Sequence, residues 1–337
     1  MTASHPASPA CTAVRHTALT LVLLAGSLIM PCLAGAAPLS PGDILVVAVD
    51  PPLPPFSSML FEFTRTGAVV QSFDIPDAGD LFARDAAVDG SGRVEVHEGR
   101  SQPVLDMLDP STGQWSSRTI AGWGGNDNYN YGAVAVAGAS VIATDEQNVG
   151  ESGATSGLVR FPLPTGPGDR PVTNASYIDV AVGLDGLVYA LDSQGAVDGV
   201  AIDVYDPVSF ALLKRITLPA GLSARAIAVD GSGRVFVGSW QAALYRLSPA
   251  GVVEASATTF SLGLGSQSLI DVDVDGQGTV AAGASRGAAF VTNSAFDPAA
   301  TRLLYRGNGY PTYVATTPGA AVPVIRSTWG AVKALYR

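Results

Sequence analysis

The sequence predicts an all-β protein that folds as a six-bladed β-propeller, and three observations support this. The 337 residues are 47% hydrophobic and only 14% charged, and 38 glycines with 23 prolines indicate many turns and few long helices. A strand–turn–strand unit recurs along the chain, with four strand signals in each repeat. The two ends of the repeat region carry complementary parts of one further unit.

The repeat is clearest in residues 226–240, where two short runs of small and β-branched residues flank an Asp-Gly-Ser-Gly turn. The glycines supply the positive φ angles that such a hairpin needs. Strands at 243–247 and 252–257 would complete a blade. Copies aligned on the last valine of the first strand recur every 45–48 residues, at Val88, Val136, Val182, Val229 and Val274, with a fainter copy at 313–316.

The start of the repeat region predicts how the ring closes. Residues 42–49, 59–63 and 69–75 have the pattern of the second, third and outer strands of a blade that lacks its inner strand. The C-terminal copy at 312–316 can supply that strand, which would place both chain ends in one sheet and protect two edges. A seventh blade is the alternative, if residues 321–337 form strands.

The segments that flank the repeats predict export. Residues 1–36 have the pattern of a signal peptide, with Arg15 before an apolar run and Ala34-Gly35-Ala36 as a cleavage motif. The run is shorter than the ~20 residues of a membrane span. Both cysteines, Cys11 and Cys32, lie in this segment, so the mature chain would have no disulfide. We expect a secreted or periplasmic protein with its propeller at 37–319 and a tail at 320–337 that forms a short helix or a sorting tag.

A net charge of −10 argues against nucleic acid and anionic membranes as partners, because both would be repelled. The acidity favours a cation, a basic protein or a neutral sugar. We expect a monomer whose partner is a protein or a carbohydrate, with no membrane span.

The repeated inner strand and turn, as in residues 226–237, resemble the NHL-repeat, gluconolactonase and streptogramin-lyase group of six-bladed propellers, over residues 42–317. The resemblance to gluconolactonase implies a divalent cation in the channel, held at the starts of the inner strands. The residues at those positions are not metal ligands: Arg84, Gly132, Ile178, Arg225 and Ile270. The resemblance to streptogramin lyase implies catalytic histidines, but the mature chain keeps only His97, which we expect at the surface.

Three aspartates, Asp85, Asp179 and Asp271, occupy the same position of three inner strands and are expected to face one level of the channel. Together they could hold Ca²⁺ or another divalent cation, or bind a sugar. The alternative is that each accepts hydrogen bonds from nearby backbone amides, or pairs with Arg84 or Arg225.

The loops that lead into the inner strands, here called the lead-in loops, form the second candidate site. Aromatic rings beside amides are typical of carbohydrate recognition, although turn chemistry alone also explains the Asn and Gly residues. The candidates on this face are Asn126, Asn128, Tyr131, Tyr177 and Tyr310. The longer loop at 145–156 belongs to the same face.

These patterns predict a non-catalytic binding or interaction propeller that uses the lead-in face and needs no cofactor. The alternative is a metal-assisted hydrolase or lyase that acts on a lactone or sugar derivative, with the three aspartates as ligands. A structural cell-surface protein retained through its tail is the third possibility.

Overall fold

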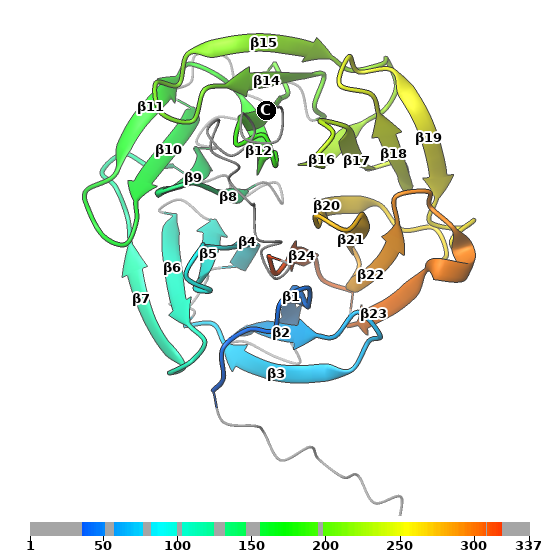
Figure 1. The fold of residues 1–337 in the computed structure, drawn as a ribbon, viewed down its shortest axis with the longest axis horizontal. Helices are drawn as coiled ribbons and strands as arrows, with labels where there is room; N and C mark the ends of the chain where they lie inside the picture. The colour runs from blue at the N-terminus through cyan, green and yellow to red at the C-terminus, as the bar shows by residue number, and fades with distance from the viewer. Residues whose placement is uncertain are drawn as a thin grey trace, which may run out of the picture. The chain divides into compact units, whose positions relative to one another are not determined.

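A four-stranded antiparallel sheet is the repeating unit of the computed structural model (Figure 1). The structure describes residues 36–50, 57–76, 82–99, 103–124, 132–145, 156–194, 198–307 and 309–318. Within these ranges all strands belong to six such sheets, and the one helical element is the short 3-10 turn η1 (Pro298–Ala300). The predicted six-bladed all-β fold is confirmed.

The blades are numbered in chain order, and their strands are given from the inside outward. Blade 1 consists of β24 (Thr312–Thr316), β1 (Ile44–Asp50), β2 (Ser57–Phe63) and β3 (Val69–Asp74). Blade 2 consists of β4 (Phe82–Val88), β5 (Val94–Gly99), β6 (Val104–Asp109) and β7 (Gln114–Arg118). Blade 3 consists of β8 (Val134–Ala137), β9 (Ser140–Asp145), β10 (Gly157–Pro162) and β11 (Asp169–Thr173).

The second half of the chain repeats this order. Blade 4 consists of β12 (Tyr177–Val182), β13 (Val188–Asp192), β14 (Ala201–Tyr205) and β15 (Leu212–Thr217). Blade 5 consists of β16 (Ala224–Val229), β17 (Val235–Ser239), β18 (Ala243–Leu247) and β19 (Val253–Thr258). Blade 6 consists of β20 (Leu269–Val274), β21 (Thr279–Ala284), β22 (Ala288–Asn293) and β23 (Arg302–Arg306).

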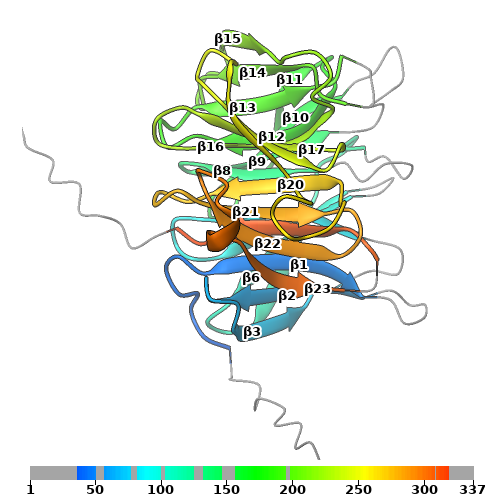
Figure 2. The ribbon, with the colours of Figure 1, turned by 90° about the vertical axis from the view of Figure 1, so that its right-hand side faces the viewer.

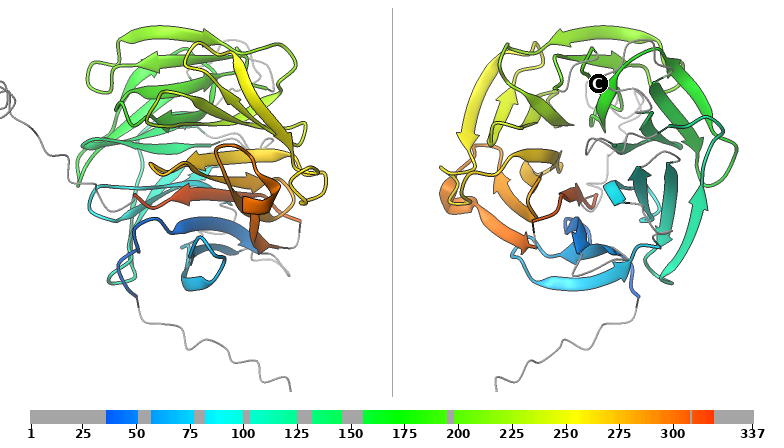
Figure 3. Two further views of the ribbon diagram at one scale, coloured as in Figure 1. Left: turned by 45° about the vertical axis from the view of Figure 1, so that its right-hand side comes forward. Right: turned by 180° about the vertical axis from the view of Figure 1, so that it is seen from behind.

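The inner strands surround a common axis. Each contacts the inner strands of the two neighbouring blades, in the order β24, β4, β8, β12, β16, β20 and back to β24. Figure 2 shows the strands running along this axis, and Figure 3 shows the same ring from behind. The free edge of every inner strand therefore faces the channel, where it has no strand partner.

The core lies between the blades, with one apolar cluster at each of the six boundaries in the described part of the chain. Strand β1 shows why these strands are apolar at successive positions. Ile44 and Val46 pack in the cluster shared with blade 6, whereas Leu45 and Val47 pack in the cluster shared with blade 2. A sheet that is buried on both faces needs apolar residues throughout rather than at alternate positions.

The ring closes as the sequence predicts. Strand β1 pairs antiparallel with β24, with Val46 opposite Val314, so segments from both ends of the repeat region share one sheet. Arg65, in the turn after β2, reinforces the closure by contacting blade 6. Its guanidinium pairs with Asp275 and donates to Gln277 Oε1 at 2.7 Å.

The position predicted for His97 from the sequence is wrong. His97 was expected at the surface, but it is 0% exposed, because β5 is a second strand that is covered on both sides by neighbouring blades. The proposed signal segment, apart from Ala36, and the proposed tail at 320–337 lie outside the described residues. No helix among the residues that the structure describes is long and apolar enough to cross a membrane.

Candidate active site in the central channel

The central channel holds a cavity of about 400 Å³ near the ends of the inner strands. All six inner strands line it, including residues 85–88 of blade 2 and residues 314–316 of blade 1. The turns that follow inner strands add Leu184, Gly276 and Gln277. The cavity thus lies toward the face of the Asp-Gly turns, opposite the lead-in face on which the sequence analysis placed ligand binding.

Leu184 marks the mouth of this cavity. Its side chain is 63% exposed and lies close to the equivalent turns of the next two blades. A Cβ atom added to Gly231 would lie 3.1 Å from Leu184 Cδ1, and one added to Gly276 would lie 3.8 Å from the same atom. Leu184 therefore extends over part of the channel opening.

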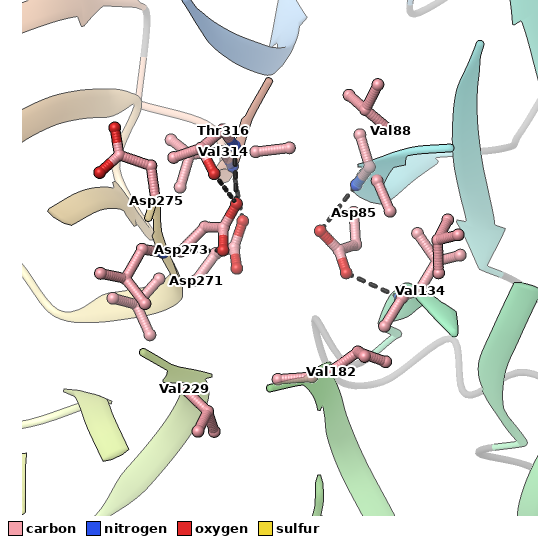
Figure 4. A pocket seen from close by; sticks show the side chains of 18 of the residues that line it. Asp85, Val88, Val134, Val182, Val229, Asp271, Asp273, Asp275, Val314 and Thr316 are labelled. Carbon is pink, nitrogen blue, oxygen red and sulfur yellow. Dashed lines mark hydrogen bonds between the residues drawn. The ribbon is translucent and has the colours of Figure 1, made fainter. Parts of the chain in front are cut away.

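The three aligned aspartates do face the same channel, as Figure 4 shows for Asp85 and Asp271. Each is 7% exposed and accepts hydrogen bonds from backbone N–H groups of inner strands. Asp85 accepts from Ala86 at 2.6 Å and from Val134 of the next blade at 2.7 Å. Asp179 accepts from Val180 at 2.9 Å and from Ile227 of the next blade at 2.5 Å.

These contacts follow from the geometry of the propeller. The N–H groups on the channel edge of an inner strand have no ladder partner, and an unpaired backbone donor is costly. Each aspartate bridges one such group of the next inner strand, and Asp271 does so to Val314 at 2.5 Å. The bridges join blades 2 and 3, 4 and 5, and 6 and 1. This arrangement matches the alternative in which the aspartates bind backbone amides.

A fourth carboxylate, Asp273, was missed by sequence reasoning. It accepts from Val274 N at 2.7 Å, from Thr316 N at 2.6 Å and from Thr316 Oγ1 at 2.8 Å. A second bridge therefore joins blade 6 to blade 1, where the ring closes. The signal was present in Asp271-Val272-Asp273, because alternate residues of a strand project to the same side.

Burial and mutual repulsion favour the neutral form of these carboxyls. Burial raises the pKa of Asp179 to about 7, although the N–H donors of Ile227 and Val180 act in the opposite direction. Burial also raises the pKa of Asp85 well above its usual range, and the nearby Asp271 and Asp179 add to this shift. The pKa of Asp271 is raised in the same way, by burial and then by Asp179.

The carboxylates do not fit the cation site that the sequence analysis considered. No group of three or more His, Cys, Asp or Glu residues in the described ranges could hold a metal ion. Asp85 and Asp179 already bind backbone N–H groups through both oxygens, each bridging two strands. A hard cation needs several oxygens that converge on one point.

The two arginines of the prediction lie away from the cavity lining. Each lies near the start of an inner strand, at the point where the pairing with the second strand shifts register, Arg84 in β4 and Arg225 in β16. Arg225 pairs with Asp198 through Nε at 2.8 Å and lies over the ring of Trp240. Arg84 is buried beside His97, and burial followed by the Arg84 charge lowers the pKa of His97 to about 3.

The lead-in face differs from the prediction in its aromatic residues. Tyr177 is buried, and its hydroxyl donates to Asp203 at 2.8 Å, so its ring packs between blades instead of facing solvent. Trp123 is also buried and donates to Thr144 O. Tyr310 is 38% exposed. Asn126, Asn128 and Tyr131 lie outside the described residues, as does most of the loop at 145–156.

A scan of protein-family models and a search of curated proteins found no match to this sequence. Among solved structures, the chain is similar to the PQQ-bound form of aldose sugar dehydrogenase from Streptomyces coelicolor, with a TM-score of 0.52 and 14% identity over 70% of this chain and 85% of that one. It is also similar to a protein of unknown function from Bacteroides caccae, with a TM-score of 0.53 and 9% identity over 82% and 99% of the two chains. These likenesses show the β-propeller fold.

The comparison corrects the first functional prediction. We expected a non-catalytic binding module, but the similar structure of assigned activity is a sugar-directed enzyme. The prediction of a non-catalytic role is therefore wrong, and the enzymatic alternative has the better support.

Proposed function

We propose that this chain is an enzyme, a hydrolase or lyase that acts on a sugar-derived lactone or a related sugar derivative, and that its chemistry takes place in the central channel. The observation that carries the proposal is Asp179, which lines the cavity with a pKa of about 7. A carboxyl with a pKa near neutrality can both take up and return a proton at working pH. Perturbed acids in a cavity are typical of catalytic sites.

The neighbouring carboxyls supply a complementary function. Burial and the nearby aspartates raise the pKa values of Asp85 and Asp271 well above the usual range, which favours the neutral forms of both carboxyls. A neutral carboxyl can donate a hydrogen bond to negative charge that develops on a substrate oxygen. In this proposal Asp179 acts as the base, and the carboxyls of Asp85 and Asp271 act as hydrogen-bond donors.

Lactone hydrolysis in this site would proceed through proton transfers at Asp179. The Asp179 carboxylate takes a proton from water as the water oxygen bonds to the lactone carbonyl carbon. The carboxyl of Asp85 or Asp271 donates to the carbonyl oxygen as that oxygen becomes negative. The ring C–O bond then breaks, and Asp179 returns its proton to the departing ring oxygen.

The resemblance of the inner strands to the gluconolactonase and streptogramin-lyase group supports this choice of reaction. The chain departs from that group at the starts of its inner strands, where Arg84, Ile178, Arg225 and Ile270 stand. No step above uses a metal ion, because these residues and the channel aspartates do not provide a set of convergent ligands.

Export is part of the proposal. The apolar run and the Ala34-Gly35-Ala36 motif support removal of residues 1–36 and function in the periplasm or outside the cell. N-terminal sequencing of protein recovered from the periplasm or medium should identify Ala37 as the first residue. Recovery of the full-length chain in the cytoplasm alone would contradict this part of the proposal.

The enzymatic part is tested by a panel of neutral sugar lactones and related sugar derivatives, with wild type and Asp179→Asn compared. We expect turnover by wild type, an inflection of the pH–rate profile near pH 7, and a loss of roughly 10²–10⁴-fold in kcat for Asp179→Asn. Asp230→Asn is the matched control, because Asp230 is a similarly buried aspartate that binds a hairpin turn and does not line the cavity. Equal loss in both variants, or no turnover of any substrate by folded wild type, would overturn the proposal.

A further inference from the structure

The ionisable side chains of the described channel lining are all acidic. Five aspartates line the cavity, Asp85, Asp179, Asp271, Asp273 and Asp275, and no Lys, Arg or His of the described ranges joins them. Arg65 reaches Asp275 from outside the lining and pairs with it. The other four accept hydrogen bonds from backbone groups but contact no basic side chain in the described ranges.

Several neutral donors of the lining already have acceptors. The backbone N–H groups of Val134, Ile227 and Val314 donate to aspartates. The hydroxyl of Thr316 donates to Asp273, and that of Thr317 donates to backbone oxygens at Ser40 and Asp43. An anion that enters this cavity loses hydration and meets five acidic side chains and no basic one in the described lining, which is unfavourable.

This chemistry differs from what PQQ requires. PQQ is a quinone that carries carboxylate groups, and a protein recognises carboxylates through arginine, lysine or free N–H donors. The similar Streptomyces enzyme is a PQQ-bound form, whereas the described lining of this channel holds five aspartates and no arginine or lysine to pair with such a ligand. The residues present do not fit the cofactor.

We infer that the channel excludes anionic ligands, PQQ among them, and admits neutral polyols and positively charged amines. The inference rests on the proposed function for its choice of the channel as the substrate site. It narrows the substrate to an uncharged sugar derivative or an amino sugar. A sugar acid or a sugar phosphate would be rejected at the mouth.

The test measures the charge selectivity of the channel without using activity. A cysteine is placed in the channel wall by Val182→Cys, at the mouth by Leu184→Cys, and on the outer surface by Val208→Cys, where the side chain is 80% exposed. The full chain carries Cys11→Ser and Cys32→Ser so that each variant has one thiol. Each thiol is reacted with a cationic and an anionic methanethiosulfonate reagent of matched size.

We expect the ratio of cationic to anionic reaction rates to be about tenfold higher at Val182→Cys than at Val208→Cys, with Leu184→Cys between them. Adding Asp273→Asn should lower the ratio at position 182. The ratio should rise between pH 5.5 and pH 8, because Asp179 ionises over this range. Equal ratios at the three positions, or faster reaction with the anionic reagent in the channel, would overturn the inference.

Equilibrium dialysis of the same full-length protein against PQQ, with and without Ca²⁺, provides the second readout. We expect no retention of PQQ at micromolar concentration in either condition. Retention that is lost in a channel variant such as Val182→Trp would overturn the inference. Neither experiment depends on turnover, so a charge-indifferent channel would remove this inference and leave the lactone assay to decide the proposed function.

Discussion

Single aspartates complete the hydrogen bonding of strands that end at the channel, and the effect of removing one can be stated. Asp273 is the clearest case, because it accepts from two backbone N–H groups and one hydroxyl across the boundary between blades 6 and 1. Asp273→Ala leaves Val274 and Thr316 without these acceptors. We expect a loss of roughly 1–3 kcal/mol in the free energy of unfolding, measured by urea denaturation.

The matched control is Asp109→Ala, because Asp109 binds the N–H and hydroxyl of Ser111 in a surface turn where water can replace it. It should cost clearly less than Asp273→Ala. A similar or larger loss for the surface variant would show that the bridging aspartates do not stabilise the strand edges.

The residue scale is also where sequence reasoning was least complete. The shared position of Asp85, Asp179 and Asp271 was visible because the repeats could be aligned. Their partners were not, because Val134, Ile227 and Val314 lie 43–49 residues further along the chain. The burial of His97 and Tyr177 depends on packing between blades, which a local pattern does not reveal.

The hairpin turns between the first and second strands of blades 2 and 5 share an aspartate–arginine pair, and blade 6 differs. In blades 2 and 5, an aspartate at the turn binds the arginine four residues later, as Asp89 does with Arg93 and Asp230 with Arg234. In blade 6 the equivalent residue after Asp275 is Thr279. Arg65, from blade 1, pairs with Asp275 and also donates to Gly42 O at 2.8 Å. A contact within one hairpin has become a contact between blades.

Because Arg65 contacts a neighbouring blade, its removal should lower the free energy of unfolding more than removal of Arg93. Arg65→Ala should lower the free energy of unfolding by about 1–3 kcal/mol, because it leaves a buried carboxylate without its charged partner. Arg93→Ala is the control, since it removes a similar pair without loosening a blade boundary. Amide hydrogen exchange at β24 and β1 should increase in Arg65→Ala alone. Unchanged exchange there would mean that strand pairing closes the ring without help from Arg65.

At the scale of elements, the sequence was highly informative. Hairpins with a fixed period predicted the inner strand at 226–230 and the third strand at 243–247, and the structure has them at Ala224–Val229 and Ala243–Leu247. The composite blade was also predicted, because incomplete units at the two ends complement each other. The position of the cavity along the channel was not predicted, because it depends on side chains from all six blades.

At the scale of the whole molecule, the ring concentrates protonatable groups on its axis, and this determines how stability changes with pH. Asp179 has a folded-state pKa of about 7 and an ordinary value of 3.8, and the pKa values of Asp85, Asp271 and Asp273 are also raised. The folded state therefore binds protons more tightly than the unfolded state. Stability from these groups is fully present at low pH and is lost as pH rises through the folded-state pKa values.

Other groups act in the opposite direction. The lowered pKa of His97, about 3, makes stability rise with pH up to its unfolded value near 6.5. The lowered pKa values of Asp89 and Asp230 contribute stability that is lost only below pH 4. These groups contribute equally in wild type and in a variant of Asp179, so a comparison of the two proteins isolates the effect of Asp179.

We therefore expect the melting temperature of wild type to fall relative to that of Asp179→Asn between pH 5 and pH 7, by roughly 2–4 °C for each kcal/mol lost. Asp179→Asn cannot ionise at this position, so it should lack the fall in stability that Asp179 causes below pH 7. Asp109→Ala should leave the slope unchanged, because its carboxylate is ionised throughout this range. Thermal unfolding followed by circular dichroism across the pH series measures both effects. If the melting temperatures of wild type and Asp179→Asn changed equally over this interval, Asp179 would already be ionised in the folded protein, and it would then lack the proton that the proposed mechanism requires it to exchange near pH 7.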